Sequence, residues 1–170
     1  MKRLLVCLLL CVGVVGCGES EQDRAITALE KYGPAIKKDK HGNAIDLYDR
    51  TNGIGDADLK YLEGLPKIEG LVIGNQVTDA GLEHLKGLTQ LKSLNLGSGQ
   101  FTDAGLEHLR GLVKLESLVL NKEITDAGLE HLKGLTNLSF LNLAGTQVTD
   151  AGVAELQKAL PNCEISHTNP

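Results

Sequence analysis

The sequence has few aromatic residues and no cluster of basic residues. Phenylalanine, tyrosine and tryptophan make up 3% of the 170 residues, and 17 lysines and arginines face 22 aspartates and glutamates, for a formal net charge of −5. Proteins that bind nucleic acid usually present a basic surface with aromatic side chains to the phosphates and bases. No such stretch is present, and an acidic surface repels phosphate. The composition therefore predicts that nucleic acid is not a partner.

The sequence also lacks recognisable catalytic signatures. It shows no Ser-His-Asp arrangement, no glycine loop that would cradle a phosphate and no CxxC pair. Gly87, Gly111 and Gly134 each follow a basic residue in the last turn of an expected helix, which is typical of a helix stop. The sequence thus predicts a protein that is not an enzyme and uses no cofactor.

The N-terminal hydrophobic run is too short to cross a membrane. Residues 4–15 are 12 apolar residues preceded by Lys2 and Arg3, whereas a spanning helix needs roughly 20. This pattern predicts the core of a signal peptide.

What the chain has in abundance is internal repetition. The octapeptide TDAGLEHL begins at Thr78, Thr102 and Thr125, and a weaker copy, TDAGVAEL, begins at Thr149, at intervals of 24, 23 and 24 residues. A period in this range is typical of a solenoid, in which each unit buries its apolar face by stacking on the next.

One repeat shows the expected local structure. Thr78 or Asp79 can cap a helix, and Leu82 and Leu85 would form its buried stripe. The helix should end before Gly87. Residues 91–96, LKSLNL, then alternate apolar and polar side chains as in a short strand. Each repeat is therefore expected to contain one short helix and one short strand.

The L-x-x-L-x-L pattern with this period resembles the leucine-rich repeat, and the TDAGL helix start resembles a bacterial subtype related to the cysteine-containing leucine-rich repeats. The resemblance extends over about residues 44–165. It implies an α/β solenoid with a short parallel sheet on the concave face, short helices on the convex face and an N-terminal helical cap. We assign residues 24–170 to this domain: 24–55 as the N-terminal cap and first strand, 56–148 as core repeats and 149–170 as the C-terminal cap. Within the first part, a helix is expected over residues 24–32 and a strand over 44–47.

The residues that follow the hydrophobic run, Val14-Val15-Gly16-Cys17, resemble the lipobox of bacterial lipoproteins. The resemblance implies a signal peptide of residues 1–16, lipidation of Cys17 and a tether over residues 17–23. The protein would then be exported and anchored in a membrane through its lipid, with the outer membrane favoured in a cell that has two. The alternative is an ordinary secretory signal with an incidental cysteine.

If Cys17 is acylated and the signal peptide removed, Cys163 is the one cysteine left with a free thiol. No disulfide framework is then expected. Cys163 stands where the repeats place their first strand leucine, so we expect a buried thiol; a redox or dimerising thiol is the alternative.

Two rows of polar residues recur once per repeat. Helix capping accounts for the aspartates, Asp79, Asp103, Asp126 and Asp150. The histidines, His84, His108 and His131, would lie on adjacent helices about 10 Å apart, too far for one zinc ion with ligands at about 2.1 Å. We therefore expect a solvated convex face and no metal site.

The concave face remains as the candidate binding surface. Its expected side chains are small and uncharged apart from one aromatic anchor, Phe140, and the candidates are Gly70, Val72, Ser93, Asn95, Ser117, Val119, Asn121, Phe140 and Asn142. The sequence predicts non-catalytic binding of a protein or peptide through this face. One alternative is a structural protein that self-associates through an edge strand near Ile165. A metal-binding or hydrolytic protein that uses the histidine row is less favoured.

Overall fold

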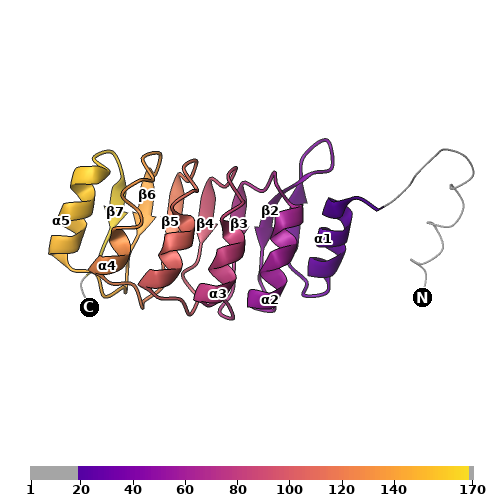
Figure 1. Ribbon diagram of the computed structural model, residues 1–170, viewed down its shortest axis with the longest axis horizontal. Helices are drawn as coiled ribbons and strands as arrows, with labels where there is room; N and C mark the ends of the chain where they lie inside the picture. Colours follow the sequence, from indigo (N-terminus) through magenta and orange to yellow (C-terminus); the bar gives the residue numbers. More distant parts are fainter. Residues whose placement is uncertain (1–18, 169–170) are drawn as a thin grey trace, which may run out of the picture.

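The computed structural model describes residues 19–168, which form a curved solenoid built on one seven-stranded sheet in the order β1-β2-β3-β4-β5-β6-β7 (Figure 1). The strands are β1 (Ala35–Lys38), β2 (Ala44–Tyr48), β3 (Gly70–Val72), β4 (Ser93–Asn95), β5 (Ser117–Val119), β6 (Phe140–Asn142) and β7 (Glu164–Ser166). The helices are α1 (Glu21–Glu30), α2 (Asp56–Leu59), α3 (Asp79–Leu82), α4 (Asp126–Leu129) and α5 (Asp150–Ala159), with 3-10 helices η1 (Lys60–Gly64), η2 (Glu83–Leu85) and η3 (Asp103–Leu109).

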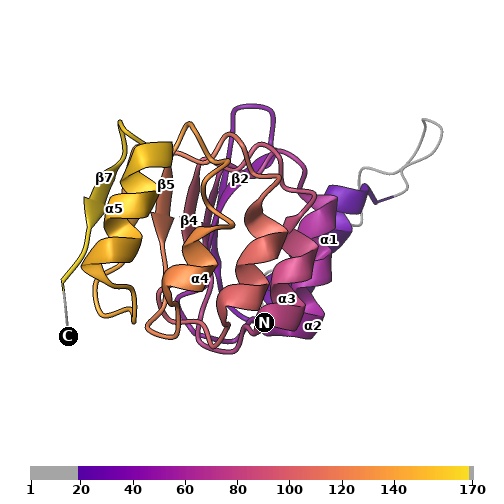
Figure 2. The same cartoon turned by 60° about the vertical axis from the view of Figure 1, so that its left-hand side comes forward.

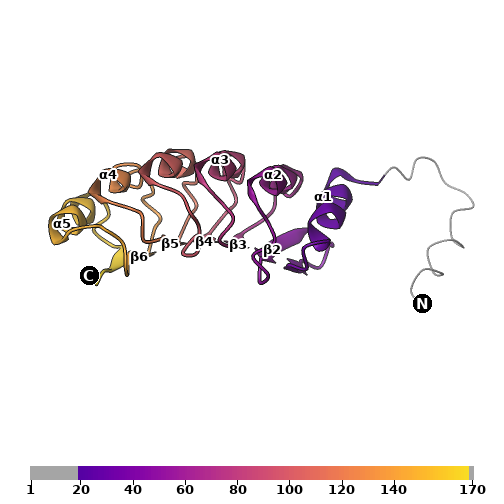
Figure 3. The ribbon, with the colours of Figure 1, turned by 90° about the horizontal axis from the view of Figure 1, so that it is seen from below.

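The sheet lines the inner side of the curve and the helices lie along the outer side (Figure 3). Strands β2 to β7 are parallel, and each repeat pairs with the next in constant register, so that Leu71, Leu94, Leu118 and Leu141 form one row across the sheet. Figure 2 shows the helices side by side in front of the strands. The predicted leucine-rich-repeat solenoid, with a concave parallel sheet and convex helices, is confirmed.

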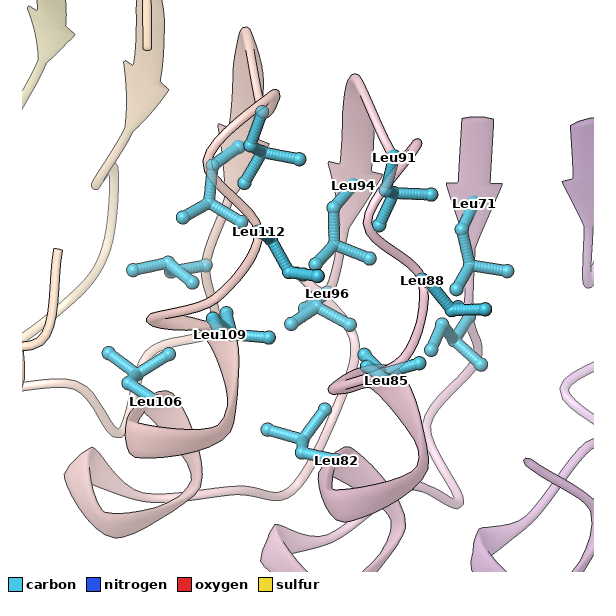
Figure 4. Packing of buried hydrophobic residues seen from close by; sticks show 14 of the residues in the cluster. Leu71, Leu82, Leu85, Leu88, Leu91, Leu94, Leu96, Leu106, Leu109 and Leu112 are labelled. Carbon is cyan, nitrogen blue, oxygen red and sulfur yellow. The ribbon is translucent and has the colours of Figure 1, made fainter. Parts of the chain in front are cut away.

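Leucines from the helices and the strands meet in a continuous core between the two layers (Figure 4). Leu82 and Leu85 from one repeat, like Leu94 on its strand, have at most 1% of their surface exposed. Burying one such side chain contributes about 1.5–3 kcal/mol. Isolated helices of one or two turns are unstable in water, so it is this packing that keeps the convex helices folded.

The TDAGL motif forms a ladder of hydrogen bonds between successive repeats. Thr78 caps α3 by accepting from the Ala80 N–H, while its own N–H and hydroxyl donate to the two carboxylate oxygens of Asp56 at 2.8 and 2.6 Å. The same carboxylate–threonine contact recurs three times, in the pairs Asp79/Thr102, Asp103/Thr125 and Asp126/Thr149.

The prediction that the aspartates cap the helices is therefore wrong in its detail. Threonine provides the capping oxygen, and each of the first three predicted aspartates accepts hydrogen bonds from the following repeat. Asp150, in the last repeat, instead lies 3.4 Å from Nδ1 of His167.

The N-terminal cap differs from the prediction in two places. Helix α1 begins at Glu21, three residues before the expected start at Arg24, because Ser20 and Asp23 form a capping box. A strand that was not predicted, β1, precedes β2 and pairs with it antiparallel around the turn at residues 39–43. The predicted signal peptide and Cys17 lie outside the described residues.

The C-terminal end agrees with the prediction. Strand β7 adds the last parallel strand, and Cys163 has 4% of its surface exposed in the core. Burial raises the pKa of the Cys163 thiol above its usual value. Over residues 19–168, none of the helices combines the length and hydrophobicity that a bilayer-spanning segment requires.

Candidate functional site

The concave surface consists of the outward-facing residues of the strands, arranged in two columns by the sheet register. The first column runs through Gly70, Ser93, Ser117 and Phe140, and the second through Val72, Asn95, Val119 and Asn142. Ser93 is exposed, and the remaining members except Gly70 are half-buried. The predicted columns are therefore present, on the four parallel strands β3 to β6 that the leucine core holds in place.

The two asparagines of the second column are fixed by their own turns. Oδ1 of Asn95 accepts from the Gly97 N–H at 3.0 Å, and Oδ1 of Asn142 accepts from the Ala144 N–H at 2.9 Å. Their Nδ2 groups have no hydrogen-bond partner among the described residues. Both amides thus present donors in a defined orientation on the concave face.

Gly70 lies in the predicted column but is buried. The carboxylate of Asp46, its register partner on β2, covers it so closely that an added Cβ would overlap Asp46 Oδ1. Lys37 on β1 pairs with the same carboxylate at 3.3 Å. Gly70 therefore offers no contact surface, and an ion pair closes this end of the first column.

The prediction that Asn121 contacts a partner on the concave face is wrong. Its side chain is 2% exposed, and Nδ2 donates to the carbonyls of Gly99 and Phe101, both at 2.9 Å. The amide binds the turn of the preceding repeat, so Asn121 is a structural residue and not a contact residue.

The residue of the second column that lies on β2 is Tyr48, which was not among the predicted residues. Tyr48 is the register partner of Val72 on β3 and of Ala35 on β1, and 40% of its surface is exposed. It adds a second aromatic side chain to the concave face, at the opposite end from Phe140. Continuing the alternation of β2 by one residue past Leu47 would have found it.

A charged row borders the first column. Lys92 Nζ lies 2.8 Å from Glu69 Oε2, and this hydrogen bond, with the nearby charge of Glu116, raises the pKa of Lys92. Beside this row is a hollow of about 380 Å³, lined by Lys92, Lys114, Glu116, Asn137 and Ser139. The concave face is thus uncharged along the two columns from β3 to β6 and polar at this margin.

The histidine row lies half-buried on the convex side. His84 Nδ1 contacts Glu63 Oε1 at 2.9 Å, and His131 Nδ1 accepts from Arg110 Nε at 3.0 Å. In the part of the chain that the structure describes, no three His, Cys, Asp or Glu side chains are grouped so that they could hold a metal ion. The histidines that have partners contact the neighbouring repeat.

Comparison with known families and structures supports the fold. The family profile described as Leucine Rich repeat matches residues 87–109 and 134–156. Similar solved structures include internalin C2 from Listeria monocytogenes (32% identity, TM-score 0.51, covering 64% of this chain and 46% of that one). They also include the internalin inlF from the same organism (33% identity, TM-score 0.55, covering 66% and 32%). The ectodomain of the receptor kinase SOBIR1 from Arabidopsis thaliana (15% identity, TM-score 0.53, covering 87% and 91%) shares the fold alone.

A search of curated proteins found no match. The chain is an α/β solenoid of leucine-rich repeats, and its structural neighbours include bacterial internalins. It spans less than half the length of either internalin.

Proposed function

We propose that this protein is a non-catalytic module that binds a protein or peptide through the concave face of its sheet. The proposal rests on one observation: across β4, β5 and β6, two accessible, uncharged columns of small and aromatic side chains run along a preformed sheet. Because the side chains are small, a partner's backbone can approach the sheet closely, and the fixed Nδ2 donors of Asn95 and Asn142 can pair with its carbonyls. Phe140 and Tyr48 are the large side chains that would anchor it.

We further propose that Cys17 is lipidated and that the protein is exported and anchored in the bacterial envelope, in the outer membrane where there are two membranes. The lipobox-like Val14-Val15-Gly16-Cys17 supports this. Only residues 18–20 separate Cys17 from the first residue of α1, and three extended residues span about 10 Å. The folded domain would therefore lie close to the bilayer.

The test of concave-face binding is crosslinking and capture from the native envelope with three baits. The first is the wild-type protein. The second is the Ser93→Arg, Asn142→Arg double variant, which places two bulky cations on the concave columns. The third is Ala80→Arg, Ala127→Arg, which adds the same charge at exposed convex positions.

If the partner binds the concave face, the wild type and the convex variant should capture a protein that the concave variant does not capture. Identical captures by all three baits would contradict the proposal. Circular dichroism of each bait confirms that the comparison is made between folded proteins.

Self-association is the second candidate function. Among the strands of residues 19–168, β7 pairs with β6 alone, and its other edge is the end of the sheet. Such an edge can pair with another chain. Sedimentation at increasing concentration tests this idea, and a strict monomer at high concentration would eliminate it.

A further inference from the structure

The N-terminal end of the concave face contains a hollow that extends from Val72 of the second column beyond the predicted residues. It has a volume of about 520 Å³ and is lined by Ala35, Tyr48, Asp49, Arg50 and Val72. Ala35, Tyr48 and Val72 are register partners on β1, β2 and β3, so three adjacent strands form an apolar floor. The hollow is therefore continuous with the second column of the proposed binding face.

The two charged residues of the hollow, Asp49 and Arg50, differ in exposure and in hydrogen bonding. The Asp49 carboxylate is 5% exposed and accepts from the N–H groups of Thr51, Gly53 and Ile54 at 3.2–3.3 Å. Its charge is thus directed into its own turn. The exposed Arg50 side chain has no hydrogen bond or ion pair with any described residue.

Two other cations of the concave side, unlike Arg50, have a carboxylate partner. Lys37 is paired with Asp46, and Lys92 with Glu69. In the next repeat Gly74 follows Val72 by two residues, as Arg50 follows Tyr48, so this position adds no side chain that could pair with the guanidinium. The space over Gly74 itself is filled by Asn52 and Asp49. An unpaired guanidinium therefore borders an apolar hollow, on a protein whose net charge is negative.

We propose that this hollow binds the C-terminal residue of an extended peptide, with its apolar side chain against Tyr48 and Val72 and its carboxylate on Arg50. A guanidinium pairs a carboxylate through two parallel hydrogen bonds. A chain terminus fits this place because the sheet ends one strand further on, at β1. A peptide that lies along the columns from Phe140 toward Tyr48 thus ends at Arg50. This inference rests on the proposed concave-face function and adds the direction and the end group of the ligand.

The test is a titration of the purified, ¹⁵N-labelled protein with four capped tetrapeptides, followed by amide chemical shifts. The first is acetyl-Ser-Ser-Val-Leu with a free carboxylate, and the second is its C-terminal amide. The third, acetyl-Ser-Val-Asp-Ser amide, places the carboxylate on an internal side chain. The fourth, acetyl-Ser-Ser-Ser-Ser with a free carboxylate, lacks the apolar side chain.

We expect the first peptide to shift the amide signals of Ala35, Tyr48, Arg50 and Val72 and to bind at least about tenfold more tightly than the other three. Arg50→Gln should remove this preference for the free acid, and Tyr48→Ala should remove the preference for leucine over serine. Arg24→Gln is the matched control, because Arg24 is an exposed arginine on α1, away from the hollow.

Equal binding of acid and amide, no effect of Arg50→Gln, or no shift at the hollow would each overturn the inference. Tight binding of the third peptide would assign the carboxylate to an acidic side chain and reject the chain terminus. Shifts at Asn95 and Asn142 without shifts at the hollow would reject this inference and leave the proposed function intact. Loss of the capture difference between concave and convex baits would reject that function itself.

Discussion

At the scale of single residues, the TDAGL motif is explained by contacts between repeats. The carboxylate of Asp79 accepts from the Thr102 N–H at 2.8 Å and from its hydroxyl at 2.9 Å. The same carboxylate lies against Gly105 so closely that an added Cβ would overlap it. Threonine, aspartate and glycine are thus needed together because each repeat binds the next through all three.

This contact predicts the effect of substituting one glycine. Gly105→Ala should destabilise the fold by about 1–3 kcal/mol, because the methyl group must displace the Asp79 carboxylate or the Leu82 side chain. Gly111→Ala, where an added Cβ would meet no atom within 4 Å, should change stability by less than about 0.5 kcal/mol. Urea denaturation of both variants measures the difference, and equal losses would contradict the ladder.

The alternation of apolar and polar residues located most of the concave residues but wrongly placed Asn121 among them. The pattern places Asn121 just beyond the second column, and nothing in its own repeat distinguishes it from an outward-facing residue. Its burial depends on the carbonyls of Gly99 and Phe101 in the preceding turn. The covering of Gly70 likewise depends on a neighbour, Asp46. Periodicity describes each repeat separately, so contacts specific to one pair of repeats were not predictable from it.

The buried thiol predicts a pH dependence of stability. Burial raises the pKa of Cys163, so the folded protein holds the thiol proton more tightly than the unfolded chain does. The resulting stabilisation is complete below the ordinary thiol pKa and is lost as the pH rises toward the raised value. As the pH rises above the ordinary thiol pKa, the wild type should therefore lose more stability than Cys163→Val. Parallel pH profiles of the two proteins would contradict this.

At the scale of elements, the short convex helices α3, η3 and α4 depend on their threonine caps, because each contains only one or two turns. Thr102 caps η3 by accepting from the Ala104 N–H and donates its hydroxyl to Asp79. Thr102→Val should therefore cost about 1–2 kcal/mol. Thr89→Val is the control, since this exposed loop threonine has no side-chain hydrogen bond among the described residues. Thermal unfolding of both variants is the measurement, and a neutral Thr102→Val would show that the cap is dispensable.

The repeated elements were predictable and the N-terminal elements were less so. Inside the repeats, leucine spacing and helix stops agree in three successive repeats. Strand β1, in contrast, consists of Ala35-Ile36-Lys37-Lys38, which is too short and too basic to show the alternation of a strand. It forms because the Asp39 carboxylate closes the turn by accepting from the His41 and Asn43 N–H groups. The missed strand also concealed the hollow at Arg50.

At the scale of the whole molecule, the proposed lipid anchor at Cys17 would determine where the solenoid works. If Cys17 is lipidated, Cys17→Ser should move the protein from the membrane fraction to the soluble fraction without changing its circular dichroism. Detergent phase partition of cell extracts measures this. Retention of the Cys17→Ser variant in the membrane fraction would contradict a lipid anchor at this position.

The central claim is that a partner contacts the concave sheet, and photocrosslinking in living cells tests this most directly. A photoreactive amino acid is placed at Val119 in the second concave column or at the exposed convex residue Ala127. We predict a discrete crosslinked adduct from position 119 and none from position 127. An adduct from position 127 alone, or from neither position, would contradict binding through the concave face.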